Sequence, residues 1–150
     1  MKIDLRPAVP GDYDFCKSLY FAQNRWILEA LQLDHAAHEA RFPEQWKAAE
    51  VRIILLDGED VGWLQSAAQA ELLFLSQLYI ARSFQGRGIG TKVMHRMIAE
   101  ARHANRPIAL DVVKINPALR LYQRLGFRIT GEEEHKFNMT LDPALDNDHP

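Results

Sequence analysis

The segment from Glu71 to His103 constrains the fold more than any other part of this chain. Residues 71–81 (ELLFLSQLYIA) are apolar on both alternating faces, as expected for a strand that is covered on each side. A glycine-rich stretch follows from Gln85 to Gly90 (QGRGIG), and residues 91–103 then carry apolar side chains along one stripe of a helix. A buried strand that turns through glycines into an amphipathic helix predicts an α/β sheet.

The remaining elements extend this α/β order without a linker or an internal repeat. The turn Asp57-Gly58 predicts a tight hairpin, because both central residues of such a turn take positive φ. The early strands are therefore antiparallel and the later ones partly parallel, in one domain over residues 1–150. Residues 142–150 are expected to fray. Strands are predicted near 2–8, 51–56, 61–65, 71–81, 108–113, 127–130 and 136–141, and helices near 14–31, 35–41, 91–103 and 116–125.

Composition limits the partners. The 20 acidic and 18 basic residues give a net charge of −2, whereas a nucleic-acid-binding domain needs a basic face. No apolar run reaches the roughly 20 residues that cross a bilayer, and the first residues lack the apolar core of a signal peptide. Cys16 is the only cysteine, which excludes an internal disulfide or a cysteine zinc cage. We therefore expect a cytoplasmic protein that has no metal and no nucleic-acid or membrane partner.

The glycine stretch favours a phosphate site. Glycines let the backbone pass close to a ligand, and the helix that follows begins with unpaired N–H groups. A tight turn with no ligand is the alternative. A P-loop would need lysine after the glycine, and Gly90 is followed by Thr91. The G-x-G-x-G spacing also departs from the G-x-G-x-x-G fingerprint, which disfavours a nicotinamide-dependent oxidoreductase.

Two motifs in this order resemble one family. Residues 85–90 match the pattern Q/R-x-x-G-x-G/A, and residues 116–127 (NPALRLYQRLGF) match N-P-A-x-x-L-Y-x-x-x-G-F. Both are signatures of the GNAT-type N-acetyltransferases, and the chain is similar to that family in detail from about Glu71 to Phe127. Many members have proline where this chain has Arg82, which concerns the local turn.

The resemblance implies a fold and a cosubstrate. The fold is a single mixed sheet with helices on both faces and a splayed parallel pair of strands, between which acetyl-CoA binds. The end of the strand before the glycines would meet the pantetheine arm, the glycine loop would hold the pyrophosphate, and the second motif would supply a further contact. The residues implied are Leu78, Tyr79, Ile80, Gln85, Gly86, Arg87, Gly88, Ile89, Gly90, Thr91 and Asn116.

Acetyl transfer also sets chemical requirements. The departing thiolate needs a proton, and the resemblance implies Tyr122 as the general acid, although such a tyrosine could equally be a packing residue. The amine must lose a proton, and no base is assigned; Gln77 cannot accept one but could order a water. Ser76, Gln77 and Trp26 are candidates for contacting the acceptor, and residues 132–134 (EEE) could attract a cationic amine.

The expected function is transfer of the acetyl group of acetyl-CoA to a primary amine of a small molecule or peptide. The transfer is expected to be direct, in a ternary complex, because Cys16 fits the core better than a nucleophile. A non-catalytic acyl-CoA sensor is the alternative, since no base is evident. Many relatives of this kind pair, so a homodimer is possible.

Overall fold

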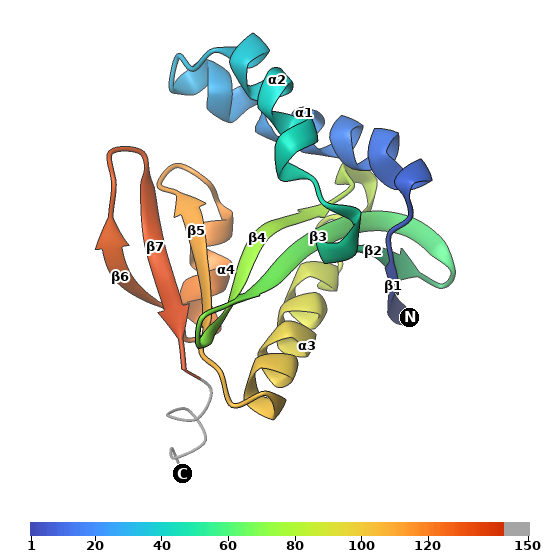
Figure 1. Cartoon of the computed structure of the whole chain (residues 1–150), viewed down its shortest axis with the longest axis vertical. Coiled ribbons are helices and arrows are strands. Elements are labelled where there is room, and N and C mark those ends of the chain that lie inside the picture. Colours follow the sequence, from blue (N-terminus) through green and yellow to red (C-terminus); the bar gives the residue numbers. More distant parts are fainter. Residues whose placement is uncertain (143–150) are drawn as a thin grey trace. The chain divides into compact units, whose positions relative to one another are not determined.

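The structure is a computed structural model that describes residues 1–142 (Figure 1). The fraying expected after residue 142 lies outside the described residues. The strands are β1 (Ile3–Pro7), β2 (Val51–Leu56), β3 (Glu59–Gln69), β4 (Leu72–Ile80), β5 (Ile108–Val113), β6 (Arg128–Glu132) and β7 (Lys136–Leu141). The helices are α1 (Tyr13–Ala30), α2 (His35–Gln45), α3 (Ile89–His103) and α4 (Ala118–Arg124), with short 3-10 turns η1 (Pro10–Asp12), η2 (Ala48–Glu50) and η3 (Arg82–Phe84).

The seven strands form one mixed sheet. Their order is β1-β2-β3-β4-β5-β7-β6. The pairs β1–β2, β2–β3, β5–β7 and β6–β7 are antiparallel, and β4 pairs with β5 in parallel, joining Leu73–Leu75 to Ile108–Leu110. The expected sheet, antiparallel early and with a parallel pair later, is confirmed.

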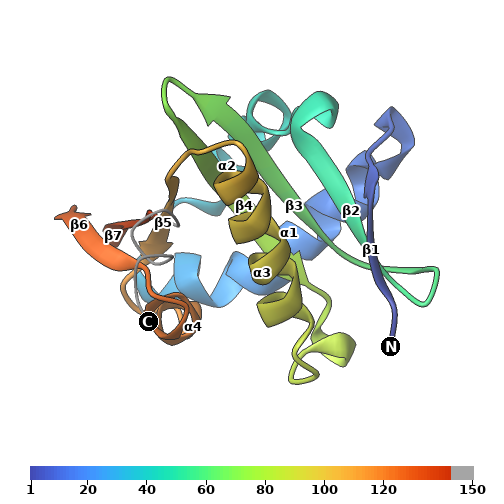
Figure 2. The ribbon, with the colours of Figure 1, turned by 90° about the horizontal axis from the view of Figure 1, so that it is seen from below.

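The chain divides into two compact units. The first unit comprises residues 1–65 and 77–90, and the second comprises residues 66–76 and 91 onward. The chain therefore crosses from one unit to the other inside β3, inside β4 and inside the first turn of α3. In the second unit, α4 packs against β5, beside the β6–β7 hairpin (Figure 2).

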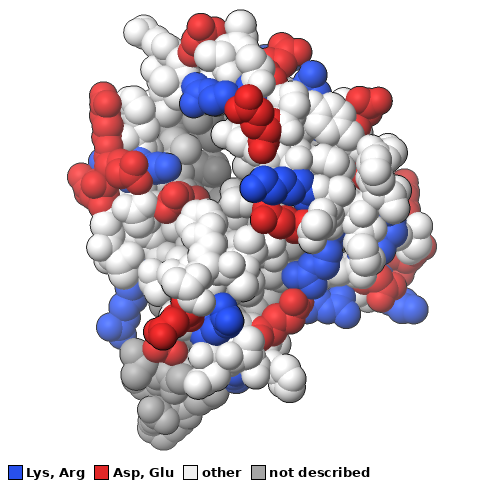
Figure 3. All heavy atoms as spheres, in the orientation of Figure 1, with Lys and Arg blue, Asp and Glu red and all other residues white. Residues whose placement is uncertain are grey.

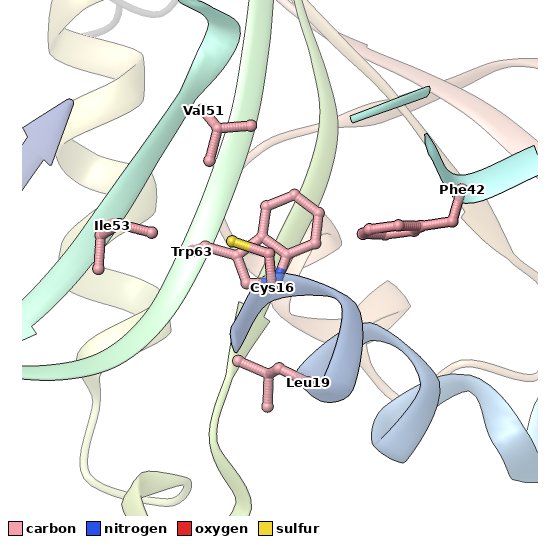
Figure 4. Packing of buried hydrophobic residues seen from close by; sticks show 6 residues of the cluster. All are labelled: Cys16, Leu19, Phe42, Val51, Ile53 and Trp63. Carbon is pink, nitrogen blue, oxygen red and sulfur yellow. The ribbon is translucent and has the colours of Figure 1, made fainter. Parts of the chain in front are cut away.

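The core of the first unit lies where α1 and α2 meet β2 and β3. It contains Cys16, Leu19, Phe42, Val51, Ile53 and Trp63, of which Trp63 is completely buried (Figure 4). Cys16 and Leu19 are three residues apart and so share one face of α1. The packing of these core side chains fixes α1 over the strands.

The predicted hairpin turn between β2 and β3 is confirmed, with φ of 50° at Asp57 and 86° at Gly58.

The start of α1 and the end of α2 each depend on a contact with another element, and α2 ends later than the predicted residue 41. Asp12 precedes α1 but does not cap it, because its carboxylate accepts hydrogen bonds from the Arg6 guanidinium and the Val9 N–H instead. Helix α2 continues past Arg41 to Gln45 although Pro43 lies within it. Buried Phe42, which packs on the ring of Tyr20 at 5.1 Å, holds this last turn against the core.

The second unit has its own buried side chains. On α3 they lie along the predicted stripe, and they are joined by alternate residues of β5 and by residues of α4, the following turn and β7. These are Val93, Met94, Met97, Ile98, Ala101, Ile108, Leu110, Val112, Tyr122, Phe127, Met139 and Leu141. The helical stripe is confirmed, and the buried residues of β5 alternate as in a strand with one covered face.

Candidate active site

The glycine loop between η3 and α3 is open. Gly86 and Gly88 have φ of 78° and 80°, a region that L side chains rarely adopt. A Cβ atom built on either glycine would meet nothing within 4 Å. The glycines are therefore required by the backbone conformation and not by close packing within the protein. This is the arrangement expected of a loop that a ligand approaches.

The loop leads directly into α3. The helix begins at Ile89, whose side chain is buried and anchors this end of the helix. The N–H groups of a first helical turn have no partner in their own helix and attract anionic oxygens. Arg87, which is exposed, places its guanidinium 5.2 Å from the centre of the Phe84 ring. The residues 85–91 thus offer backbone donors and positive charge to a phosphate.

The polar pair in the middle of β4 consists of one exposed and one half-buried residue. Ser76 is exposed, whereas Gln77 is half-buried and accepts a 2.5 Å hydrogen bond from the Tyr79 hydroxyl. The Tyr79 ring packs against Tyr20 of α1 at 5.6 Å and against Trp63 at 5.3 Å. Gln77 is therefore held on the face of β4 that α1 covers, where an acceptor bound under α1 would find it.

The end of β4 is bound by the protein's own groups. The Ile80 carbonyl accepts hydrogen bonds from the side-chain amides of Gln23, on α1, and of Gln85, the latter at 2.9 Å. The Ala81 N–H donates to the Val61 carbonyl at 2.7 Å. Sequence reasoning missed Gln23. It lies four residues after buried Leu19 and four before buried Ile27, so a glutamine on the apolar stripe of α1 was the available signal.

Tyr122 and Asn116 belong to the second unit. Tyr122 lies on α4 with 8% of its surface exposed, and its ring packs on Phe127 at 5.9 Å. Burial raises the pKa of the Tyr122 hydroxyl to about 12. The hydroxyl of Tyr122 is thus protonated at neutral pH. Asn116 accepts a 2.9 Å hydrogen bond from the Ala118 N–H, so its side chain orders the start of α4.

The other sequence candidates lie in less specific settings. Trp26 is 45% exposed on α1, so it is a surface residue of that helix. Acidic side chains gather at the tip of the β6–β7 hairpin, with basic groups beside them (Figure 3). Glu132 pairs with Lys114 at 3.1 Å and Glu133 with Lys136 at 3.7 Å. These carboxylates are partly neutralised, which weakens their attraction for a cationic amine.

The structure therefore groups the predicted residues by unit. The first unit brings together Gln77–Ile80, the loop 85–90 and α1, including a glutamine that the sequence did not single out. The second unit carries Asn116, two residues before α4, and Tyr122 within α4. Cys16 is completely buried, and burial raises its pKa to about 11, so its thiol is protonated. Among residues 1–142, no helix is long and apolar enough to cross a bilayer.

Comparison with known proteins identifies the family. Residues 18–127 match the model of the acetyltransferase (GNAT) family. The chain therefore belongs to this family, a class of acetyl-CoA-dependent acyltransferases.

Individual relatives agree with this assignment. An uncharacterized N-acetyltransferase of Methanocaldococcus jannaschii is 30% identical over 70 residues, which cover 45% of this chain and 31% of the relative. A protein of Bacillus subtilis subsp. natto, named a probable spermine N(1)-acetyltransferase, is 38% identical over 64 residues, which cover 40% of this chain and 41% of the relative. The chain thus matches less than half of either relative.

A solved structure shares the fold. The PaiA N-acetyltransferase from Thermoplasma acidophilum, in complex with coenzyme A, superposes with a TM-score of 0.77 over 95% of this chain and 99% of its own, at 14% identity. At this identity the likeness concerns the fold alone.

Proposed function

We propose that this protein transfers the acetyl group of acetyl-CoA to a primary amine of a small molecule or peptide, directly and in a ternary complex. The whole chain would act as one functional domain, because the family match includes segments of both units and the Thermoplasma structure aligns with 95% of the chain. The two units would thus contribute to one reaction.

The open glycine loop carries the proposal. Gly86 and Gly88 hold positive φ with nothing near their missing side chains, and the loop runs into the start of a 15-residue helix. The space beside both glycines leaves the backbone of the loop accessible to a ligand. We assign the pyrophosphate of acetyl-CoA to the backbone of residues 86–91, with Arg87 adding positive charge.

Tyr122 is our candidate for the general acid. In the reaction the amine nitrogen forms a bond to the carbonyl carbon, the carbon–sulfur bond breaks, and the thiolate takes a proton. A phenol with pKa about 12 is a weak acid toward water but retains its proton throughout the physiological range. In a dry site it can donate that proton, or a hydrogen bond, to the sulfur as negative charge develops.

The state of the only thiol supports direct transfer. The completely buried Cys16, with pKa about 11, offers no exposed thiolate to carry the acetyl group. Within the described residues, the candidate for ordering the acceptor is Gln77, which Tyr79 holds in place. Gln77 cannot accept a proton, so we propose that it orients the amine or a water that does.

The acceptor class rests on the net charge and on one relative. A slightly acidic chain favours a cationic amine over a polyanion. The relative named a probable spermine N(1)-acetyltransferase puts polyamines at the head of the amines to be tested. Amino acids and peptide amino termini complete the panel, because Trp26 and Gln77 are not specific to polyamines.

Steady-state kinetics tests the ternary mechanism. Initial rates measured against both substrates should give intersecting lines in a double-reciprocal plot. The intact protein incubated with acetyl-CoA alone should keep its mass. Parallel lines together with an acetylated protein would replace direct transfer by a covalent intermediate. Binding of acetyl-CoA without turnover of any amine would favour the acyl-CoA sensor.

A further inference from the structure

Two glutamine side chains converge on one backbone carbonyl at the end of β4. The donors are the amide of Gln23, from the middle of α1, and the amide of Gln85, the first residue of the glycine loop. The bond from Gln23 joins distant parts of the chain, because Gln23 lies 57 residues from Ile80. Side chains from separate elements meeting at one carbonyl fix that carbonyl in space.

The neighbouring backbone leaves little freedom at this point. The Ala81 N–H is bonded to the Val61 carbonyl at 2.7 Å. A Cβ atom on Gly62 would collide with the Tyr79 carbonyl, which shows how closely β3 and β4 approach here. The peptide between Ile80 and Ala81 is therefore held from both sides, by strand pairing on its N–H and by two amides on its oxygen.

The two donors differ in setting. Gln23 is half-buried on a helix whose neighbouring turns are anchored by Leu19 and Ile27, whereas Gln85 is exposed. A bond from a buried, helix-borne side chain is harder to exchange for a ligand or water than one from an exposed loop. Gln23 is thus the more firmly held of the two donors.

We propose that Gln23 is a positioning residue that, together with Gln85, holds the Ile80 carbonyl in the geometry that acetyl-CoA meets. The proposal rests on the function given above, in which the end of β4 meets the pantetheine arm. It goes further by assigning a role to α1 in cofactor binding. Ligand contact at the glycine loop would be transmitted to α1, the helix that packs on Tyr79 beside the acceptor candidate Gln77.

Substitution of Gln23 by methionine tests the proposal. Methionine keeps the length and the helix preference of glutamine but cannot donate a hydrogen bond. We expect Gln23→Met to weaken acetyl-CoA binding about three- to tenfold, the range of an ordinary hydrogen bond. It should also speed hydrogen exchange in residues 81–90 of the ligand-free protein. Gln23→Lys, which restores a donor of similar reach, should recover both properties.

Asn24→Leu is the matched control. Asn24 also donates from α1 to a backbone carbonyl, that of Tyr20 at 2.8 Å, but this bond stays within the helix. Its loss should leave acetyl-CoA affinity and loop exchange unchanged. Equal effects of the Asn24 and Gln23 variants would reduce Gln23 to a general stabiliser of α1 and overturn the proposal.

The double variant tests the joint role of the glutamines. Because each amide partly compensates for the loss of the other, Gln23→Met with Gln85→Met should weaken binding by more than the product of the single effects. A loss of affinity equal to the product of the two single losses would overturn the joint role of the two glutamines. If the unmodified protein bound no acetyl-CoA, the proposed function would fail, while the exchange rates would still judge Gln23: unchanged exchange in a folded Gln23→Met protein would contradict its role.

Discussion

The Tyr79 hydroxyl donates a 2.5 Å hydrogen bond to Gln77 Oε1, joining two residues that share one face of β4. The bond orients the Gln77 amide, which is our candidate for contact with the acceptor. Gln77→Leu should raise the acceptor KM about tenfold, the cost of one lost hydrogen bond near the upper end of the usual range, with the acetyl-CoA KM unchanged. Gln69→Leu, at the exposed end of β3, is the control. A change confined to the acetyl-CoA KM would move Gln77 to the cosubstrate side.

Gly62 allows β3 to approach β4. Its added Cβ would meet backbone atoms, which cannot rotate away as a flexible side chain can. Gly62→Ala should therefore lower the free energy of unfolding by about 1–3 kcal/mol, as overpacking does. Urea denaturation would measure it. Gly11→Ala, where the Cβ meets nothing within 4 Å, should cost little; equal losses would show that the close approach is not what Gly62 provides.

The glycine loop can be tested against a turn with the same backbone demand. Gly88→Val places a side chain where φ is 80° and where we expect the pyrophosphate, so acetyl-CoA affinity should fall at least tenfold in calorimetric titration. Gly58→Val introduces the same strain at φ of 86°, also in open space, in the β2–β3 hairpin. That variant should bind acetyl-CoA normally. Unchanged affinity in a folded Gly88→Val protein would remove the loop from the site.

Tyr122→Phe removes only the hydroxyl. The ring contact with Phe127 at 5.9 Å remains, so thermal stability should change little. Loss of a general acid should lower kcat roughly 10²–10⁴-fold, with acetyl-CoA affinity within a few-fold. Burial raises the Tyr122 pKa to about 12, so the hydroxyl keeps its proton up to about pH 11. At any pH below that value, deprotonation of Tyr122 should not lower kcat. Full activity of the variant would make Tyr122 a packing residue.

Acid should weaken the first unit through Asp12. The Arg6 guanidinium, bonded to Asp12 at 2.9 and 3.0 Å, lowers the pKa of that carboxyl. A lowered pKa stabilises the folded protein at any pH above the carboxyl's pKa in the unfolded chain, about 3.9. This stabilisation is lost as the pH falls through the lower pKa of the folded state. Asp12→Ala should cost about 1 kcal/mol at pH 7 in urea denaturation, and less at pH 3. Asp4→Ala, which removes an exposed pair with Lys2, is the control. A cost independent of pH would contradict the ion pair.

Most of the fold could be predicted from local patterns. The Asp57-Gly58 turn, the α3 stripe and the order of the strands along the chain follow from the spacing of apolar residues and from turn chemistry. Both depend on residues that are neighbours in the sequence. The end of α2 was not predicted, because the packing of Phe42 outweighs the helix-breaking tendency of Pro43.

The site was predictable only in part. The glycine loop and Tyr122 stand in contiguous motifs, so their positions could be named from the sequence, although their roles stay predictions. The hydrogen bonds of Gln23 and of Gln77 could not be foreseen, because each depends on side-chain placement after folding. A glutamine on the apolar stripe of α1 was the one visible trace of the Ile80 contact. The cytoplasmic location and the homodimer also stay predictions.

The central claim is tested most directly by weighing the products. The protein is incubated with acetyl-CoA and a panel of polyamines, amino acids and peptides, and each amine is examined by mass spectrometry while thiol release is followed. We predict that at least one primary amine gains a single acetyl group in proportion to the thiol released, and that Tyr122→Phe slows both together. Thiol release with no acetylated amine, or acetyl-CoA binding with neither product, would contradict the assignment as an N-acetyltransferase.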